Sequence, residues 1–209
     1  MAAKALAAHD MRVVVNKKGT EMASTVTVDM FVSVDGWAGG EGLPGYFGYF
    51  GPELAEWNAA EMAAPQRVIM GRRTYEAFAA LPTEAWGETR DEVMNLEKLV
   101  FSSTLDHVAW PNTRISSRDL VQEITELKGG DDVPLRTWGS LSIARQLLAA
   151  GLVDRLRIMM FPLFAGDAGR EPAFAGATSG ELELVDQRVL DGRVLLVEYR
   201  PTGNDIPRA

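Results

Sequence analysis

The apolar and polar positions of the chain follow two different periods in turn. The run STVTVDMFVSV (24–34) is rich in β-branched residues and alternates at every second position, which predicts a strand. The run PELAEWNAAEMA predicts a helix, because Pro52 suits a first helical turn and Glu53 lies near the helix N-terminus. RVIM (67–70) predicts a short buried strand, and the TYEAFAAL that follows it predicts a short helix that Pro82 ends.

The same alternation of strands and helices continues through the second half of the chain. The predicted strands are 97–103, 134–138 and 154–164, and the predicted helices are 117–128 and 140–151. Ser117 and Ser140 are the predicted N-caps of these helices, and Gly129 and Gly151 follow them. The dipeptide Asp191-Gly192 lies between two apolar runs and is the strongest hairpin signal in the chain.

Strands that alternate with helices and end in a hairpin predict a three-layer α/β/α fold. Its sheet is expected to be mixed and mostly parallel, with an antiparallel hairpin at the C-terminal end. The 209 residues fit one domain, which we place at 23–203. Residues 1–22 show no sustained periodicity and are predicted to be an extension without a catalytic role. Residues 204–209 are predicted to be a polar tail.

Composition excludes several classes of chemistry. The chain has no cysteine, which excludes disulfides, thiolate metal sites and a cysteine nucleophile. Its two histidines, His9 and His107, lie far apart in the sequence, so no metal site is predicted. The formal net charge of -8 argues against a nucleic-acid partner, and no run approaches the roughly 18 apolar residues of a membrane helix. These features fit a cytoplasmic protein without a signal peptide.

Three predicted strands end in residues that suit an anionic ligand. One runs into a glycine, two arginines and a threonine, one ends in hydroxyl residues, and one runs into Gly-Ser at a helix start. Each feature alone has an ordinary explanation as a solvated surface, a turn or a helix cap. Together, at the carboxyl ends of parallel strands, they favour a site for several phosphate groups on one ligand. The residues concerned are Gly71 to Thr74, Ser102 to Thr104, and Gly139-Ser140.

The segment GEGLPG (40–45) has the spacing of a dinucleotide-binding fingerprint but not its context. In that fingerprint the third glycine lies inside a helix that packs on the strand, whereas here Pro44 and the run YFGYFG intervene. We interpret the segment as part of a mobile aromatic loop. Its aromatic residues would cover a planar ligand or would form a hydrophobic flap over the core; they are Trp37, Tyr46, Phe47, Tyr49 and Phe50.

Several segments, taken in order, resemble the dihydrofolate-reductase-like superfamily. They are FVSVDGW, VIMGRRTYEAF, KLVFSSTL and WGSLSIARQLLAAGLVDRLRIMMFPLFAGDAG, between residues 26 and 170. They are most similar to the branch that contains the reductase domain of the riboflavin-biosynthesis deaminase-reductase, the RibD C-terminal domain. The resemblance implies that superfamily's fold, including the closing hairpin. Because the deaminase half requires a cysteine-containing zinc motif, a free-standing reductase domain is expected.

The cofactor implied by this resemblance is NADPH. Arg72 and Arg73 would meet its 2′-phosphate, where charge-assisted hydrogen bonds are strong. The segment from Gly71 to Thr74 would hold the adenosine side, Ser102 and Ser103 would line the same region, and the residues from Gly139 onward would cradle the pyrophosphate. The implied cofactor-binding residues are Gly71, Arg72, Arg73, Thr74, Ser102, Ser103, Gly139, Ser140 and Leu141.

The substrate side has fewer matching residues. Asp35, in SVDG, resembles the substrate-side aspartate of the family and is the candidate catalytic residue, although an ordinary Asp-Gly turn explains it nearly as well. In dihydrofolate reductases a carboxylate on the first helix binds the pterin, but the corresponding position falls on Ala55. Two departures from the family pattern, Asp154-Arg155 and Arg170-Glu171, would alter the substrate end or a subunit contact. The substrate-binding candidates are Asp35, Trp37, Glu53 and Glu56.

We therefore expect an NADPH-dependent reductase that transfers hydride to a small substrate, such as a ribosylaminopyrimidine of the riboflavin-biosynthesis type. One alternative is a reductase of dihydrofolate or of another small carbonyl or imine. The other is a nucleotide-binding module that has lost catalysis. The apolar strand at 154–164 and the final hairpin predict a homodimer.

Overall fold

The computed structural model describes residues 24–208, so the predicted extension at 1–22 lies outside the described residues. Its strands are β1 (Val26–Ser33), β2 (Arg67–Gly71), β3 (Glu97–Phe101), β4 (Thr113–Ser116), β5 (Leu135–Thr137), β6 (Arg155–Phe161), β7 (Leu182–Leu190) and β8 (Val194–Pro201). Its α-helices are α1 (Pro52–Ala63), α2 (Arg72–Ala79), α3 (Arg90–Asn95), α4 (Leu120–Gly130) and α5 (Leu141–Ala149). No helix within residues 24–208 is long and apolar enough to cross a membrane.

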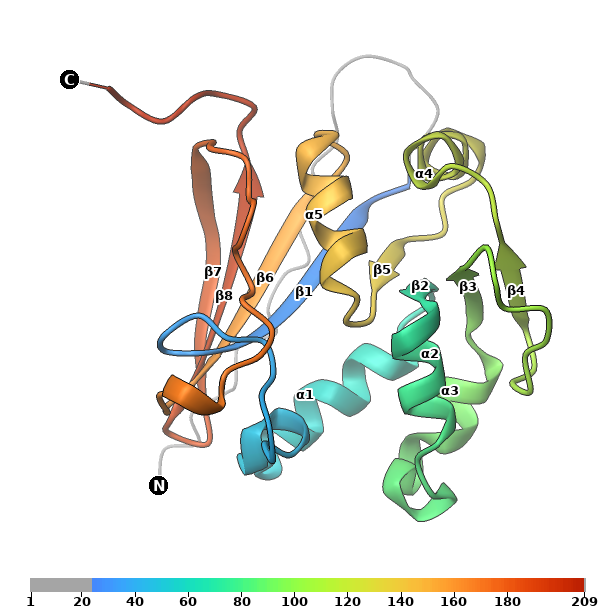
Figure 1. Ribbon diagram of the computed structural model, residues 1–209, viewed down its shortest axis with the longest axis horizontal. Helices are drawn as coiled ribbons and strands as arrows, with labels where there is room; N and C mark the ends of the chain where they lie inside the picture. Colours follow the sequence, from blue (N-terminus) through green and yellow to red (C-terminus); the bar gives the residue numbers. More distant parts are fainter. Residues whose placement is uncertain (1–23, 209) are drawn as a thin grey trace, which may run out of the picture.

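The eight strands form one sheet in the order β4-β3-β2-β5-β1-β6-β8-β7 (Figure 1). The first six strands in this order are parallel to their neighbours, and β8 is antiparallel to both β6 and β7. The predicted mixed, mostly parallel sheet with a C-terminal antiparallel hairpin is therefore confirmed. The short strand β5 lies between β2 and β1, near the centre of the sheet.

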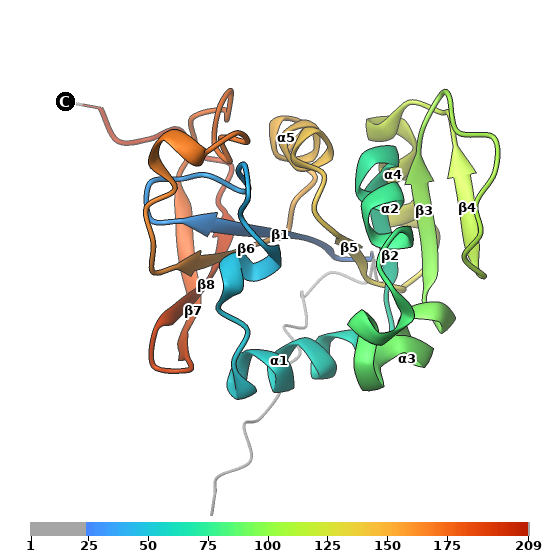
Figure 2. The ribbon, with the colours of Figure 1, turned by 60° about the horizontal axis from the view of Figure 1, so that its bottom comes forward.

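Helices cover both faces of the sheet, as Figure 2 shows for α1 and α3 on one side and α4 and α5 on the other. The alternation along β1 explains this arrangement. Val26, Val28 and Met30 pack into the core with α4 and α5, whereas Phe31 packs on the opposite face against the loop before α1. A second cluster under α1 and a third between α3, β2 and β3 complete the core.

Several predicted boundaries differ from the structure. The helix predicted at 117–128 begins at Leu120, because the side chain of Asp119 caps it by accepting a hydrogen bond from the Gln122 amide. Ser117 is therefore not the cap. The strand β4 and the short helix α3 were not predicted, since neither is long enough to show a hydrophobic period. The helix at Pro52–Ala63 and the hairpin at Asp191-Gly192 are confirmed.

Lys98 of β3 is fully buried and holds the end of α3. Its ammonium donates hydrogen bonds to the carbonyl oxygens of Val93 (2.8 Å), Met94 (3.2 Å) and Leu96 (2.5 Å). Cations are favourable at helix C-termini, where carbonyl groups lack helical partners. Burial nevertheless lowers the pKa of Lys98 to about 8, because removal from water disfavours the charged form.

This shift predicts a pH-dependent stability. Between about pH 8 and pH 10.5 the folded protein has released the Lys98 proton, whereas the unfolded chain still holds it. The unfolded state then binds more protons, so the free energy of unfolding rises with pH across this window. Urea unfolding of the wild type and of a Lys98→Met variant, below and within the window, measures the effect. A difference between the two proteins that does not change with pH would contradict it.

Candidate functional site

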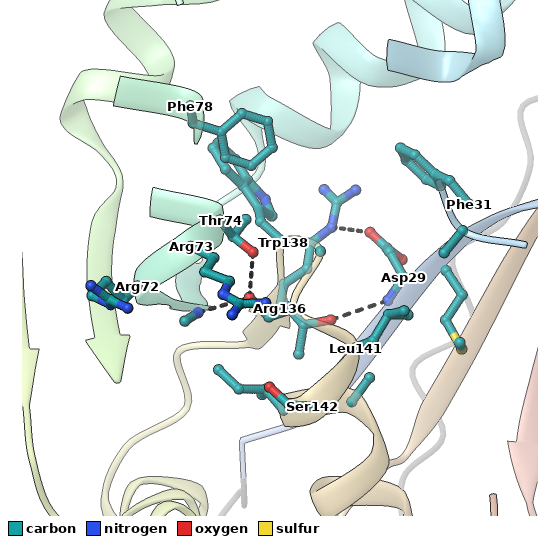
Figure 3. A pocket seen from close by; sticks show the side chains of 18 of the residues that line it. Asp29, Phe31, Arg72, Arg73, Thr74, Phe78, Arg136, Trp138, Leu141 and Ser142 are labelled. Carbon is teal, nitrogen blue, oxygen red and sulfur yellow. Dashed lines mark hydrogen bonds and ion pairs between the residues drawn. The ribbon is translucent and has the colours of Figure 1, made fainter. Parts of the chain in front are cut away.

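A cavity of about 1330 Å³ opens at the carboxyl ends of the parallel strands (Figure 3). The residues that follow β2, β3, β4 and β5 line it, together with the middle of β1 and one side of α1. Pockets for single small molecules measure roughly 300–1,000 Å³. This cavity therefore has room for a dinucleotide and a second small ligand.

All nine residues that the sequence assigned to a cofactor line this one cavity. They come from three segments that are separate in the sequence and adjacent in the sheet, since β2 lies between β3 and β5. The residues are Gly71, Arg72, Arg73, Thr74, Ser102, Ser103, Gly139, Ser140 and Leu141. The order of the strands in the sheet therefore brings these strand ends together, as the sequence predicted.

The turns after β2 and β5 are joined by the hydroxyl of Ser140. Ser140 Oγ accepts a hydrogen bond from the Gly71 amide (2.8 Å) and lies 2.6 Å from Thr74 Oγ1. Its side chain does not cap α5, which corrects the prediction made for Ser140. Its φ of 63° instead turns the chain so that the hydroxyl points toward the start of α2.

Small residues at these turns let the backbone approach a ligand. Gly139 has a φ of 55°, and a Cβ there would lie 3.2 Å from Thr74 Cγ2, so a larger residue would be strained and crowded. In α5 the Ile143 amide is bonded back to the Ser140 carbonyl, whereas the amides of Leu141 and Ser142 belong to the first turn, which a helix leaves free. The N-termini of α2 and α5 therefore converge at the cavity, and this donor set fits a ligand with phosphate groups.

Arginines add positive charge beside these helix starts. Arg72 lies 3.6 Å from Glu76 in a loose ion pair and its side chain is 45% exposed. Arg73 forms no ion pair with any residue among 24–208. Arg118, which follows β4, also lines the cavity, and its hydrogen bond to Glu126 raises its pKa. Arg118 was missed because β4 was not predicted.

The serines after β3 have different environments. Ser102 Oγ accepts hydrogen bonds from the amides of Thr104 (3.1 Å) and Leu105 (2.9 Å), which fixes the turn, and its own hydroxyl proton stays available to a ligand. Ser103 lines the cavity beside it.

The four residues assigned to the substrate do not line the cavity. Asp35 lies in the turn after β1, where its carboxylate accepts hydrogen bonds from the Ser33 hydroxyl (2.6 Å) and from the amides of Ala165 (3.0 Å) and Gly166 (2.8 Å). The Ser33 hydroxyl, followed by the Ala165 amide, lowers the pKa of Asp35 to about 2. These contacts tie the loop after β1 to the loop after β6, so the structure favours the Asp-Gly turn interpretation.

The other three substrate candidates also lie outside the cavity, each in a different environment. They are Trp37, Glu53 and Glu56. Trp37 packs on Gly169, where any side chain on the glycine would collide with the indole. Glu53 accepts a hydrogen bond from the Asp191 amide, and the Asp191 carboxylate in turn caps α1, so this pair joins α1 to the hairpin. Glu56 is an exposed residue of α1.

The aromatic loop divides its residues between core and cavity. Tyr46 and Phe50 line the cavity, whereas Phe47 is buried in the core under α1. Tyr46 and Phe47 both have positive φ, 51° and 50°, an uncommon conformation for residues with side chains. Of the five aromatic residues predicted to cover a planar ligand, Tyr46 and Phe50 line the cavity and Trp37 does not.

The polar residues at the end of the cavity between β1, β5 and α1 were not identified in the sequence. They are Asp29 of β1 and Arg136 of β5, which form an ion pair of 2.5 Å, and Asn58 of α1, which accepts a hydrogen bond from Tyr46. The sequence did contain an indication of Asp29 and Arg136, because the predicted strands VTVDMFV and PLRTW each carry one charged residue among apolar ones. Of the two departures from the family pattern, Arg170-Glu171 lines the cavity, whereas Asp154-Arg155 forms ion pairs with Lys128 and Glu198 away from it.

An open, mostly parallel sheet with a large cavity at the carboxyl ends of its strands is typical of nucleotide-binding α/β proteins. The family model of the RibD C-terminal domain matches residues 24–196. The chain therefore belongs to the RibD C-terminal domain family.

Solved structures of low sequence identity share the fold of this chain. A protein named for riboflavin biosynthesis from Shewanella sp. PV-4 has a TM-score of 0.65 at 18% identity, over 85% of this chain and 99% of its own. The diaminohydroxyphosphoribosylaminopyrimidine deaminase/5-amino-6-(5-phosphoribosylamino)uracil reductase of Thermotoga maritima has a TM-score of 0.63 at 16% identity, over 86% of this chain and 57% of its own. Dihydrofolate reductase from Enterococcus faecalis, complexed with NADP(H), has a TM-score of 0.56 at 19% identity, over 85% of this chain and 96% of its own. The predicted dihydrofolate-reductase-like fold is confirmed.

The hydrogen bonds of Asp35 predict that the Asp35→Asn variant is less stable than the wild type at neutral pH. The carboxylate stabilises the fold above the unfolded pKa of 3.8, and this contribution is lost as the pH falls toward 2. The variant should therefore unfold at a lower temperature than the wild type at neutral pH, with a difference that shrinks on acidification through this window. Thermal unfolding followed by circular dichroism measures it. A difference that stays constant through the window would contradict the assignment.

Proposed function

We propose that this protein is an NADPH-dependent reductase that transfers hydride to a small substrate such as a ribosylaminopyrimidine. The observation that carries the proposal is the meeting of three strand ends, with their arginines, hydroxyls and two helix N-termini, around one cavity. Such a donor set suits a ligand with several phosphate groups, and the remaining volume suits a second, smaller ligand.

The residues of this chain would bind and orient the two reactants. Arg72 and Arg73 would pair with the 2′-phosphate, and Ser102 would donate its hydroxyl proton nearby. The first turn of α5, from Leu141, would donate its free amides to the pyrophosphate, held in place by the contact between Ser140 and Thr74. NADPH, when bound, supplies the hydride, so the protein's contribution is orientation and electrostatics.

The names of similar proteins support this choice. The Thermotoga maritima protein is named as a phosphoribosylaminouracil reductase, and the Enterococcus faecalis enzyme is complexed with NADP(H). Both are less than 20% identical to this chain, so they support a reductase fold and leave its substrate to experiment.

NADPH oxidation tests the proposal against its rivals. The consumption of NADPH should be followed with the aminopyrimidine phosphoribosyl substrate and with dihydrofolate in parallel. Turnover of dihydrofolate alone, or of another small carbonyl or imine, would favour the alternative reductase. NADPH that binds and raises the melting temperature without being consumed would favour a nucleotide-binding module, and no rise at all would exclude the cofactor site.

The homodimer and the cytoplasmic location stay predictions. The strand β6 is paired on both edges, with β1 and β8, so it offers no free edge to a second subunit. The hairpin is the better candidate surface, because β7 lies at the edge of the sheet and exposes Leu184 and Val189. Analytical ultracentrifugation of the wild type and of a Val189→Glu variant tests whether this surface joins two copies.

The two arginines at the start of α2 predict the cofactor preference. In a variant with Arg72→Ala and Arg73→Ala, the KM for NADPH should rise by roughly tenfold or more per arginine, because each loses a charge-assisted hydrogen bond to the 2′-phosphate. The KM for NADH, which lacks that phosphate, should change little. Steady-state kinetics with both cofactors measures this.

A matched control is Arg200→Ala. Arg200 lies on β8, is similarly exposed and pairs with Glu183 away from the cavity. Its removal should leave both KM values unchanged. Equal effects of the double variant on NADPH and NADH would defeat the assignment.

A further inference from the structure

Four charged side chains form a cluster between the sheet and α1. Asp29 of β1 and Glu61 of α1 supply the carboxylates, and Arg136 of β5 and Arg157 of β6 supply the guanidinium groups. Arg136 Nε donates to Asp29 Oδ2 (2.5 Å), and its Nη1 lies 3.0 Å from Glu61 Oε2. The cluster is balanced in charge, as buried ions must be.

Asp29 is committed to the two arginines. Arg157 Nε donates to Asp29 Oδ1 (2.6 Å), and Arg157 Nη2 donates to Oδ2 (3.0 Å), the oxygen that Arg136 also holds. The Asp29 side chain is only 7% exposed. Three of the about four acceptor positions of this carboxylate are therefore occupied. Asp29 has little capacity left to accept hydrogen bonds from the amino groups of a ligand.

Arg136 keeps a donor for a ligand. Its Nε and Nη1 are used by Asp29 and Glu61, whereas no residue in the described part of the chain accepts a hydrogen bond from Nη2. The side chain is 6% exposed and borders the cavity beside Asp29 (Figure 3). A guanidinium has five donors and no acceptor, so this position can bind only an acceptor atom.

Aromatic side chains stand around this donor. Phe31, Tyr46 and Phe50 line the same end of the cavity, with ring centroids 5.2 Å apart for Phe31 and Tyr46 and 4.9 Å apart for Tyr46 and Phe50. Burial raises the pKa of Tyr46, and the charges of Arg136 and Asp29 act on it in opposite directions, so the phenol lies near the pair. Flat apolar walls beside a small number of polar groups, such as the Arg136 donor, suit a planar ring.

We infer that Arg136 is a substrate-binding residue that donates a hydrogen bond through Nη2 to an oxygen acceptor on a flat heterocyclic substrate. Asp29 and Glu61 are positioning residues, because they hold the guanidinium in one orientation and touch no ligand themselves. This inference rests on the proposed reductase function. It specifies that the substrate presents to Arg136 an oxygen attached to the ring, such as a carbonyl oxygen, rather than an amino group.

Arg157 provides a matched control for Arg136. Both guanidinium groups pair with Asp29 and Glu61, and both lie over the Trp57 ring, at 5.6 Å for Arg136 and 5.3 Å for Arg157. Arg136 borders the large cavity, whereas Arg157 faces a separate pocket of about 50 Å³ under α1. A role limited to the charge cluster would make the two arginines equivalent.

The test uses two ring probes of the same shape. Uracil presents carbonyl oxygens where 2,4-diaminopyrimidine presents amino groups. Calorimetric titration of the full chain, with and without NADPH, should show that uracil binds about tenfold or more tightly than 2,4-diaminopyrimidine, since the donor of Arg136 is left unpaired by an amino group. Arg136→Met should weaken uracil binding by a similar factor. Arg157→Met should leave it within about threefold of the wild type.

The outcomes are distinct. Tighter binding of 2,4-diaminopyrimidine than of uracil by the wild type, or equal losses in Arg136→Met and Arg157→Met, would overturn the inference. If Arg136→Met does not fold, Arg136→Lys replaces it: it keeps the charge, loses Nη2, and should still reduce the preference for uracil. Because the probes are also titrated without NADPH, their preference is measured even if NADPH fails to bind and the proposed reductase function is wrong.

Discussion

The shape of the cavity depends on β5, a strand of only three residues that pairs with β1 on one side and β2 on the other. Its middle residue, Arg136, points toward α1. The chain that follows it turns at Gly139 and Ser140, where the serine hydroxyl binds the turn after β2. A shift of β5 by one residue would move Arg136 to the opposite face and separate Ser140 from Gly71. Both ends of the cavity are therefore fixed by one register.

The charge cluster around Arg136 helps to define that register. It joins β1, β5, β6 and α1 through paired guanidinium and carboxylate groups. Buried ion pairs are often no more stable than apolar side chains of the same volume, because removing charges from water costs as much as their attraction returns. Stability alone does not account for four charges at this place. The four charges are better explained by a fixed pairing of the strands and by the donor that we infer Arg136 presents to the cavity.

The sequence was sufficient to predict the fold and the meeting of three strand ends at one end of the cavity, because both depend on local patterns. Strand ends that carry glycine, arginine or serine stand directly after apolar runs, and the sheet order brings Gly71, Ser102 and Gly139 together. The other end depends on partners more than 100 positions apart, such as Asp29 and Arg136. Asp35 illustrates the opposite case: a conspicuous carboxylate after a strand was bonded to the amides of a distant loop, which no local pattern showed.

The two ends of the cavity also differ in charge, and this difference bears on how a protein with a net charge of -8 would attract the proposed anionic cofactor. At the β2–α2 turn, Arg72 is only loosely paired and Arg73 has no ionic partner within residues 24–208, so their charge is directed at the cavity along with two helix N-termini. At the other end Arg136 is paired with the carboxylates of Asp29 and Glu61. On the proposed function, a polyanion would be attracted to the first end only, and the balanced end would receive a neutral ring, with Arg136 acting as a hydrogen-bond donor rather than as a charge. Two dissimilar reactants would then occupy separate places in one continuous cavity.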